Sequence, residues 1–334
     1  MGDERKSLGL VLGSAMPPEQ LLPTAVTADQ SGLDELWFSE DCFFTGGISA
    51  AAAALAGTER MQVGLGVVSA MLRHPALLAM EVSTLARAFP GRLSAGIGLG
   101  VPAWLRQVGR SPRSQIGAMT ECVTAVRRLL DGERLDAEGV EFSFAGVALA
   151  HPPAKPVPLY MGVSGPKMLQ LSGALADGSV LSVCAGVRYL SWAREQIEVG
   201  RAAAGRTGPH RLVAFALYAV DDDPAKARDE IRGPLSFYLS AGGPNAITRA
   251  EGISEEVAAL LDTGGRDLLA SDMPQEWLSR LAVAGTPADC ADQIASLYAA
   301  GADCVALFPV AYGRVEELAR VTAQQVMPLL ESSR

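Results

Sequence analysis

The sequence predicts an α/β protein, a (β/α)8 TIM barrel that forms a single domain over residues 1–334. Short apolar runs rich in β-branched residues alternate with longer segments of helical period along the whole chain. Eight such strand–helix pairs are present, and eight parallel strands joined by crossover helices close into a barrel. With 49% apolar and 19% charged residues, the chain is apolar enough to fill the core of such a barrel.

The predicted strands are short apolar runs that end in glycine or in polar residues. This pattern is typical of buried parallel strands, whose two faces are both covered. In chain order the predicted strands span residues 7–13, 35–38, 61–68, 93–97, 157–161, 179–183, 211–220 and 304–308.

A helical pattern follows each predicted strand. Several of these patterns begin with proline, which suits the first turn of a helix because the missing N–H has no partner there. Pro23 lies inside the first pattern and is expected to kink or delay that helix. The helices are predicted to begin near Pro17, Gly47, Pro75, Pro112, Gly165, Val187, Pro224 and Arg314.

Two segments interrupt the alternation and are predicted to be insertions, one after the fourth helix and one after the seventh strand. In the first, at about 132–156, polar and apolar residues alternate over 140–144, which indicates a small hairpin. The second is placed at about 242–284, within a stretch too long for one helix. Glycine and proline residues divide it into several short helices, at 242–244, 252, 264–265 and 274.

Composition argues against several classes of function. The 28 basic and 37 acidic residues give a net charge of −9 without a long basic run, so nucleic acid is not an expected partner. The densest apolar stretch, 48–56, is about half a membrane span, so no membrane partner is expected. The five cysteines and three histidines are scattered, which predicts neither disulfides nor a metal site. A reducing cytoplasm is the expected location.

The ends of the predicted strands indicate a site for a flat, largely apolar ligand. In a barrel of this kind, residues at the carboxyl ends of the strands build the site. These ends are poor in charge and rich in glycine, which lets backbone approach a ligand closely. Glycines at 96, 98 and 100 leave one face of the fourth strand without side chains, making room either for a ring or for a neighbouring helix.

The segment Gly162, Val163, Ser164, Gly165 joins a predicted strand to a helix. Such a turn directs backbone N–H groups and the positive end of the helix toward an anion, and Lys167 adds a charge. Phosphate is the expected ligand of such a turn. The alternative is a plain tight turn with no ligand.

Ser39, Glu40, Asp41 and Cys42 end the second strand. Adjacent strand residues point to opposite sides, so at most one of the two carboxylates is expected to face the pocket. The alternative for each is a carboxylate that caps a helix or pairs near the barrel rim. Cys42 is either an exposed thiol or a small buried apolar residue.

Several motifs, taken in this order and spacing, resemble the luciferase-like monooxygenase superfamily, and in particular its deazaflavin-dependent branch, which is similar to methylenetetrahydromethanopterin reductase. The first carries Asp-Glu-Leu-Trp-Phe-Ser-Glu-Asp and the fourth Gly-Ile-Gly-Leu-Gly. The motifs lie at residues 34–41 with 43–47, 64–67, 73–81, 91–100, 158–165 with 176–178, and 285–287 with 300–303.

The resemblance implies a cytoplasmic, usually dimeric (β/α)8 barrel that binds coenzyme F420. It also implies a non-prolyl cis peptide between Gly66 and Val67, in a bulge that backs the middle ring of the cofactor. Gly98, Leu99 and Gly100 are then expected beside the ring, Ser39 close by, and residues 162–165 with Lys167 at the phosphate. The chain departs from the family at Cys42, where histidine is common, and at Val101, where many relatives have an acid.

The function predicted from these residues is an F420-dependent oxidoreductase that transfers a hydride between the deazaflavin and a hydrophobic small molecule with a C=C, C=N or C=O bond. Asp41 or Glu40 is the candidate acid, or the charge that polarises the ring. Cys42, Met71, Trp104 and Tyr312 are the candidate substrate contacts. The alternatives are an FMN-dependent monooxygenase on the same barrel and a catalytically silent member that binds the cofactor. A homodimer is expected.

Overall fold

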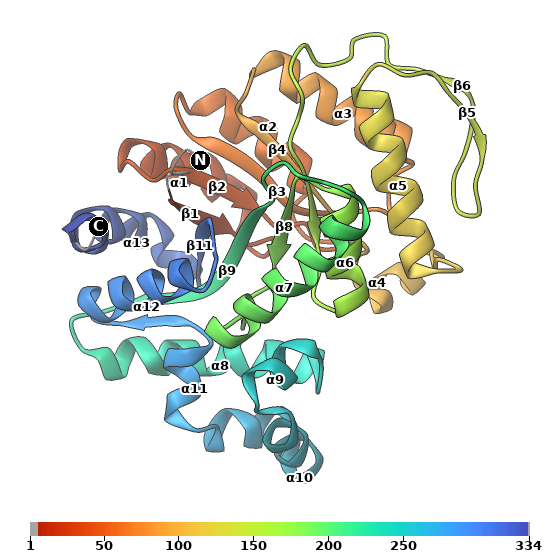
Figure 1. Cartoon of the computed structure of the whole chain (residues 1–334). Helices are drawn as coiled ribbons and strands as arrows, with labels where there is room; N and C mark the ends of the chain where they lie inside the picture. The colour runs from red at the N-terminus through yellow and green to blue at the C-terminus, as the bar shows by residue number, and fades with distance from the viewer. Residues whose placement is uncertain (1–5, 333–334) are drawn as a thin grey trace.

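The computed structural model describes residues 6–332 and contains the predicted closed barrel of eight parallel strands (Figure 1). Residues 1–5 and 333–334 of the predicted domain lie outside the described part. The closing pairs are β9 with β8 and β9 with β11, so the sheet has no free edge among the eight. The barrel strands are β1 (Ser7–Leu12), β2 (Glu35–Phe38), β3 (Gln62–Ser69), β4 (Leu93–Gly98), β7 (Leu159–Gly162), β8 (Gly178–Leu181), β9 (Arg211–Val220) and β11 (Cys304–Pro309).

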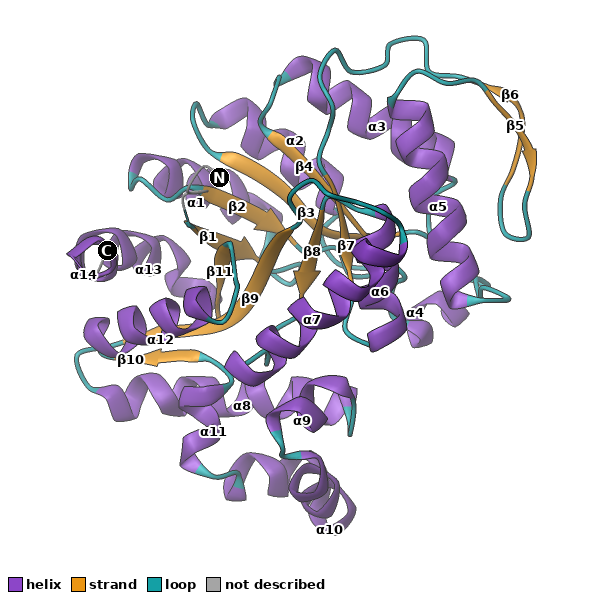
Figure 2. Cartoon of the chain, viewed as in Figure 1, coloured by secondary structure: helices purple, strands orange, loops and turns teal. Residues whose placement is uncertain are grey.

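The helices surround this barrel and cover the outer face of its sheet (Figure 2). Proline stands in the first turn of many of them, as the sequence predicts. Among residues 6–332, no helix is long and apolar enough to span a membrane. The helices that follow barrel strands are α1 (Pro18–Gln30), α2 (Gly47–Gly57), α3 (Pro75–Ala88), α5 (Gln115–Leu130), α6 (Pro166–Leu175), α7 (Val187–Ala203), α8 (Pro224–Gly242) and α13 (Val315–Val321).

Three local features differ from the sequence prediction. Helix α1 begins at Pro18 and includes Pro23, so the expected delay of the helix start is wrong. The hairpin of the first insertion pairs β5 (Leu135–Glu138) with β6 (Ser143–Val147), and the alternating run at 140–144 therefore spans its turn and the start of its second strand. A short helix, α4 (Pro102–Gln107), precedes α5 and has too few residues to show a periodic pattern.

The second insertion is helical, as predicted, and lies at one end of the molecule (Figure 1). Gly243 (φ 53°) follows α8, Gly252 (φ 73°) ends the next helix, and Gly265 (φ 65°) kinks the long one. These left-handed conformations explain why glycine stands at the breaks. The insertion contains α9 (Ala246–Glu251), α10 (Ser254–Asp272) and α11 (Gln275–Arg280).

An additional short strand, β10 (Val283–Gly285), follows the insertion and pairs with the last residues of β9. Three residues are too few for a strand pattern to be recognised in the sequence. After β10, α12 (Pro287–Ala299) leads into β11. A capping box between Thr286 and Asp289 begins this helix.

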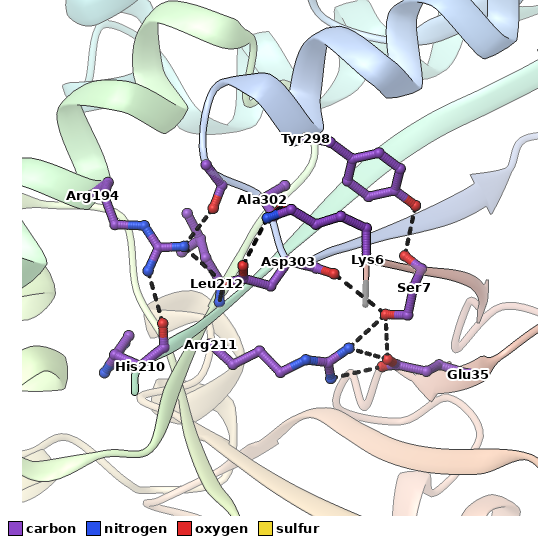
Figure 3. A network of polar contacts seen from close by, with 11 residues as sticks. Lys6, Ser7, Glu35, Arg194, His210, Arg211, Leu212, Tyr298, Ala302 and Asp303 are labelled. Carbon is purple, nitrogen blue, oxygen red and sulfur yellow. Dashed lines mark hydrogen bonds and ion pairs between the residues drawn. The ribbon is translucent and has the colours of Figure 1, made fainter. Parts of the chain in front are cut away.

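The amino-terminal end of the barrel interior is held by a buried polar network (Figure 3). The carboxylate of Glu35 accepts hydrogen bonds from Ser7 Oγ (2.6 Å), from Trp37 Nε1 (3.0 Å) and from the guanidinium of Arg211. Asp303 joins the same region, since it accepts from Arg194 and from the Leu212 amide, both at 2.8 Å. Because the buried charges of this network are paired and hydrogen-bonded, they are accommodated at the end of the barrel opposite the strand ends that form the cavity.

His210 lies beside this network, and the lowered pKa of its imidazole leads to a prediction of how the stability of the protein changes in acid. Its Nε2 lies 2.9 Å from Ser179 Oγ, and its side chain is buried. Burial, and then the positive charges of Arg194, Arg201 and Arg206, lower the pKa of His210 from 6.5 to about 4. The imidazole is therefore neutral in the folded state at a pH where the unfolded chain is already protonated.

We expect the free energy of unfolding to fall as the pH drops from about 6.5 to about 4, because the unfolded state then binds the proton that folded His210 excludes. Urea unfolding at several pH values across this window measures the slope. His210→Gln should flatten the slope, while His151→Gln, at an exposed histidine, should leave it unchanged. Equal slopes in all three proteins would contradict the assignment.

Candidate functional site

A cavity of about 660 Å³ lies at the carboxyl ends of the barrel strands. Its volume falls within the range of roughly 300–1,000 Å³ that is typical of small-molecule sites. Most of the residues predicted from the strand ends line it. These are Ser39, Glu40, Asp41, Cys42, Gly66, Val67, Gly98, Leu99, Gly100, Trp104, Gly162, Val163, Ser164 and Gly165.

The bulge in β3 forms one wall of the cavity. The peptide bond between Gly66 and Val67 is cis, as the sequence resemblance implies, and the pairing of β3 with β4 shifts between Leu65 and Val68. The bulge directs the side chain of Val67 toward the neighbouring strands. A Cβ atom on Gly98 would lie 2.5 Å from Val67 Cγ2.

The glycines of β4 and β7 therefore make room for Val67. A Cβ atom on Gly162 would lie 2.9 Å from both Val67 methyl groups, and one on Gly96 would meet the Leu65 carbonyl oxygen. The sequence left open whether this space holds a ring or a neighbouring helix. The structure shows a third arrangement, in which the bulged residue of the adjacent strand fills it.

The turn from β7 to α6 forms a second wall. Helix α6 begins at Pro166, with Gly165 at its N-cap, and apart from Gly165 and its two chain neighbours no described residue has an atom within 4 Å of the position of a Gly165 Cβ. The hydroxyl of buried Tyr189 donates a hydrogen bond of 2.8 Å to the Ser164 carbonyl and so holds the turn in place. Lys167 is exposed and does not line the cavity.

The carboxylate of Glu40 is engaged by hydrogen bonds to neighbouring parts of the chain. Its carboxylate pairs with the Arg73 guanidinium through two hydrogen bonds (2.5 and 2.8 Å) and accepts the Gly47 amide (3.0 Å) at the start of α2. All of these partners come from other elements. Glu40 therefore caps a helix and pairs near the barrel rim, which is the alternative to a catalytic role that the sequence leaves open.

Asp41 is the carboxylate that remains available on the cavity wall. It accepts a hydrogen bond of 2.5 Å from Ser14 Oγ, and the Ser14 amide in turn donates to Ser39 Oγ at 2.9 Å. These contacts join the ends of β1 and β2, which pair in the barrel. A carboxylate that accepts a hydroxyl hydrogen bond is held in one orientation and keeps acceptor capacity for a ligand.

The thiol of Cys42 is a poor nucleophile in this setting. Burial, followed by the negative charges of Asp41 and Glu40, raises the pKa of Cys42 above its usual value of 9.0. Beside it, Phe43 and Phe44 are 68% and 55% exposed, and the Phe44 ring lies 6.2 Å from that of Trp104. The rim of the cavity is thus apolar and aromatic.

Two predicted substrate contacts are not on the cavity wall. Met71 is buried in the core, and its amide donates a hydrogen bond to Ser69 Oγ at 3.2 Å. Tyr312 is not among the residues that line the cavity, and its hydroxyl lies 2.9 Å from the position that a Gly13 Cβ atom would occupy.

Three aromatic residues that the sequence reasoning missed also line the cavity: Phe215 on β9, Phe308 on β11 and Tyr238 on α8. Phe308 ends a predicted strand, so the strand-end rule would have identified it. Tyr238 has no such signal, because it lies near the carboxyl end of a long helix and not at a strand end. No group of three or more potential metal ligands occurs within the described part of the chain.

Comparison with known proteins places this geometry in a family. The family model described as luciferase-like monooxygenase matches residues 5–304. A 5,10-methylenetetrahydromethanopterin reductase of Archaeoglobus fulgidus is 29% identical over 317 residues, which cover 91% of this chain and 93% of that one. An F420-dependent glucose-6-phosphate dehydrogenase of Beutenbergia cavernae is 29% identical over 292 residues, which cover 83% of each chain.

A solved structure supports the same fold. The coenzyme F420-dependent tetrahydromethanopterin reductase of Methanopyrus kandleri superposes with a TM-score of 0.85 at 21% identity, covering 97% of this chain and 99% of that one. The family match spans most of the sequence and includes every strand end that lines the cavity except that of β11, of which it covers only the first residue. The chain belongs to the luciferase-like monooxygenase family.

Proposed function

We propose that the protein is an F420-dependent oxidoreductase that acts on a hydrophobic small molecule. The relatives reported above with a named activity are oxidoreductases, and this chain is an oxidoreductase of the same family. The observation that carries the proposal is the cavity itself. Backbone of the β3 bulge and of the glycine-rich strand ends builds most of its wall, and few charged side chains reach it.

The residues of the cavity fit a planar tricyclic cofactor with a phosphate-bearing tail. Val67, Leu99 and Phe215 offer apolar surface for the ring. Within residues 6–332, the charged side chains on the wall are Glu40 and Asp41, and Arg73 neutralises the first. A phosphate is therefore best accommodated at Gly165, where the open space and the positive end of α6 coincide.

When bound, F420 supplies or accepts a hydride at its ring. The chain orients the ring with Val67, Gly98, Leu99, Gly100 and Ser39, and holds the phosphate with residues 162–165. The aromatic rim, with Cys42 and Trp104, excludes water and receives the apolar part of the substrate. Phe44 lies in the loop after β2 and Trp104 on α4, so two different elements contribute aromatic rings beside the cavity.

Titration of the purified protein with F420 and FMN side by side tests the proposal. We expect saturable binding of F420, measured by its fluorescence, and turnover without oxygen consumption. Preferential retention of FMN with oxygen-dependent turnover would instead assign a monooxygenase. Stoichiometric F420 binding without turnover across a panel of ketones, aldehydes, imines and enones would assign a catalytically silent protein.

The sequence predicts that a carboxylate here acts either as an acid or as a charge that polarises the ring. We assign Asp41 the second role, because its carboxylate already accepts a hydrogen bond from the Ser14 hydroxyl. Asp41→Asn should leave F420 affinity nearly unchanged and lower turnover by about 10- to 100-fold. Steady-state rates with a substrate accepted by the wild type measure the effect. The control is Asp229→Asn, whose side chain is 84% exposed. Equal rates in the two variants would contradict the role.

A further inference from the structure

We infer that Tyr238 is a catalytic residue, whose phenol donates a hydrogen bond and then its proton to the carbonyl oxygen or imine nitrogen of the substrate. The inference rests on the proposed function and names the proton donor that the site otherwise lacks. Tyr238 lies on α8, outside the barrel, and reaches the same cavity as Asp41, Phe215 and Phe308.

Other proton-bearing groups of the cavity are occupied or weak. Ser69 Oγ donates to the Leu99 carbonyl at 2.9 Å. Ser39, Ser164 and Ser182 carry aliphatic hydroxyls, Gln115 a carboxamide and Trp104 an indole N–H, all of which are much weaker acids than a phenol. The Cys42 thiol is a weak hydrogen-bond donor. Glu40 and Asp41 act as acceptors in the contacts described above.

The Tyr238 hydroxyl has no hydrogen-bond partner within residues 6–332, although the side chain is half-buried on the cavity wall. A donor in this position is available to a ligand. Its titratable neighbours are Tyr312, Asp41 and Cys184. Burial, and then the charges of these neighbours, raise the pKa of Tyr238, so the phenol keeps its proton at neutral pH.

The proton balance of the step is simple. When the substrate carbonyl is reduced, its carbon would gain a hydride with both electrons from the reduced deazaflavin of the proposed function, which would be oxidised, and the C=O π bond would break toward oxygen. The phenol O–H bond of Tyr238 breaks as the O–H bond of the product alcohol forms, because an alkoxide is a stronger base than a phenolate. The phenolate then takes a proton from water.

A spectroscopic probe tests the donor without turnover. 4-(Dimethylamino)cinnamaldehyde is an apolar aromatic aldehyde whose visible absorption shifts to the red when its carbonyl oxygen accepts a hydrogen bond. We expect a red shift on binding to wild-type protein, and its loss in Tyr238→Phe with a roughly 3- to 10-fold weaker affinity. Tyr218→Phe is the matched control, because that phenol is paired with Thr322 at 2.8 Å, away from the cavity.

The control variant should shift the spectrum as the wild type does, and thermal unfolding should show that Tyr238→Phe remains folded. An unshifted wild-type spectrum, or the same shift in Tyr238→Phe, overturns the inference. F420 titration of the same proteins separates it from the proposed function. Loss of the shift with intact F420 binding supports the donor, whereas an intact wild-type shift without F420 binding overturns the cofactor proposal alone.

Discussion

Replacing Glu35 with glutamine is expected to lower the free energy of unfolding by about 3 kcal/mol, at the lower end of the range for breaking a buried ion pair. The Glu35 side chain is 6% exposed and the Arg211 side chain 27% exposed, so the pair lies mostly within the barrel. Glutamine preserves the shape but leaves the guanidinium without its counter-charge. Some solvent contact at Arg211 moderates the loss.

Urea unfolding at neutral pH measures this change. The matched control is Glu133→Gln, which breaks the pair between Arg128 and Glu133, whose side chains are 45% and 48% exposed. Exposed pairs contribute roughly 0–1 kcal/mol, so the control should be close to wild type. Similar losses in both variants would mean that burial does not set the strength of the Glu35 pair.

The second large effect concerns the space that the glycines leave for the β3 bulge. Gly98→Ala is expected to weaken F420 binding at least about 10-fold and to lower the free energy of unfolding by roughly 1–3 kcal/mol, as overpacking does. The added methyl would lie 2.5 Å from Val67 Cγ2, so Val67 must move, and both residues line the cavity. Fluorescence titration and urea unfolding measure the two effects.

A second substitution makes this prediction specific. Val67→Ala removes the methyl group with which the new side chain collides, so the double variant Gly98→Ala with Val67→Ala should recover most of the lost stability. The control is Gly208→Ala, at a position where no atom lies within 4 Å. Additive losses in the double variant would show that the two residues do not compete for the same space.

Much of the fold was predictable because its determinants are local. All eight barrel strands lie where apolar runs predict them, and the breaks in the second insertion stand at the predicted glycines. The cis peptide after Gly66 was expected from the resemblance. In contrast, β10 and α4 were missed because segments of three and six residues carry too little pattern to be recognised.

The sequence by itself therefore determined the barrel, the order of its elements and the strand ends that form the cavity. Only the tertiary structure decided which side chains are available there. Arg73 engages Glu40 and leaves Asp41 on the wall, Val67 fills the space beside Gly98, and α8 brings Tyr238 to the cavity. The physical reason is that backbone propensity acts between neighbours in the chain, whereas pairing and packing depend on residues that only folding brings together.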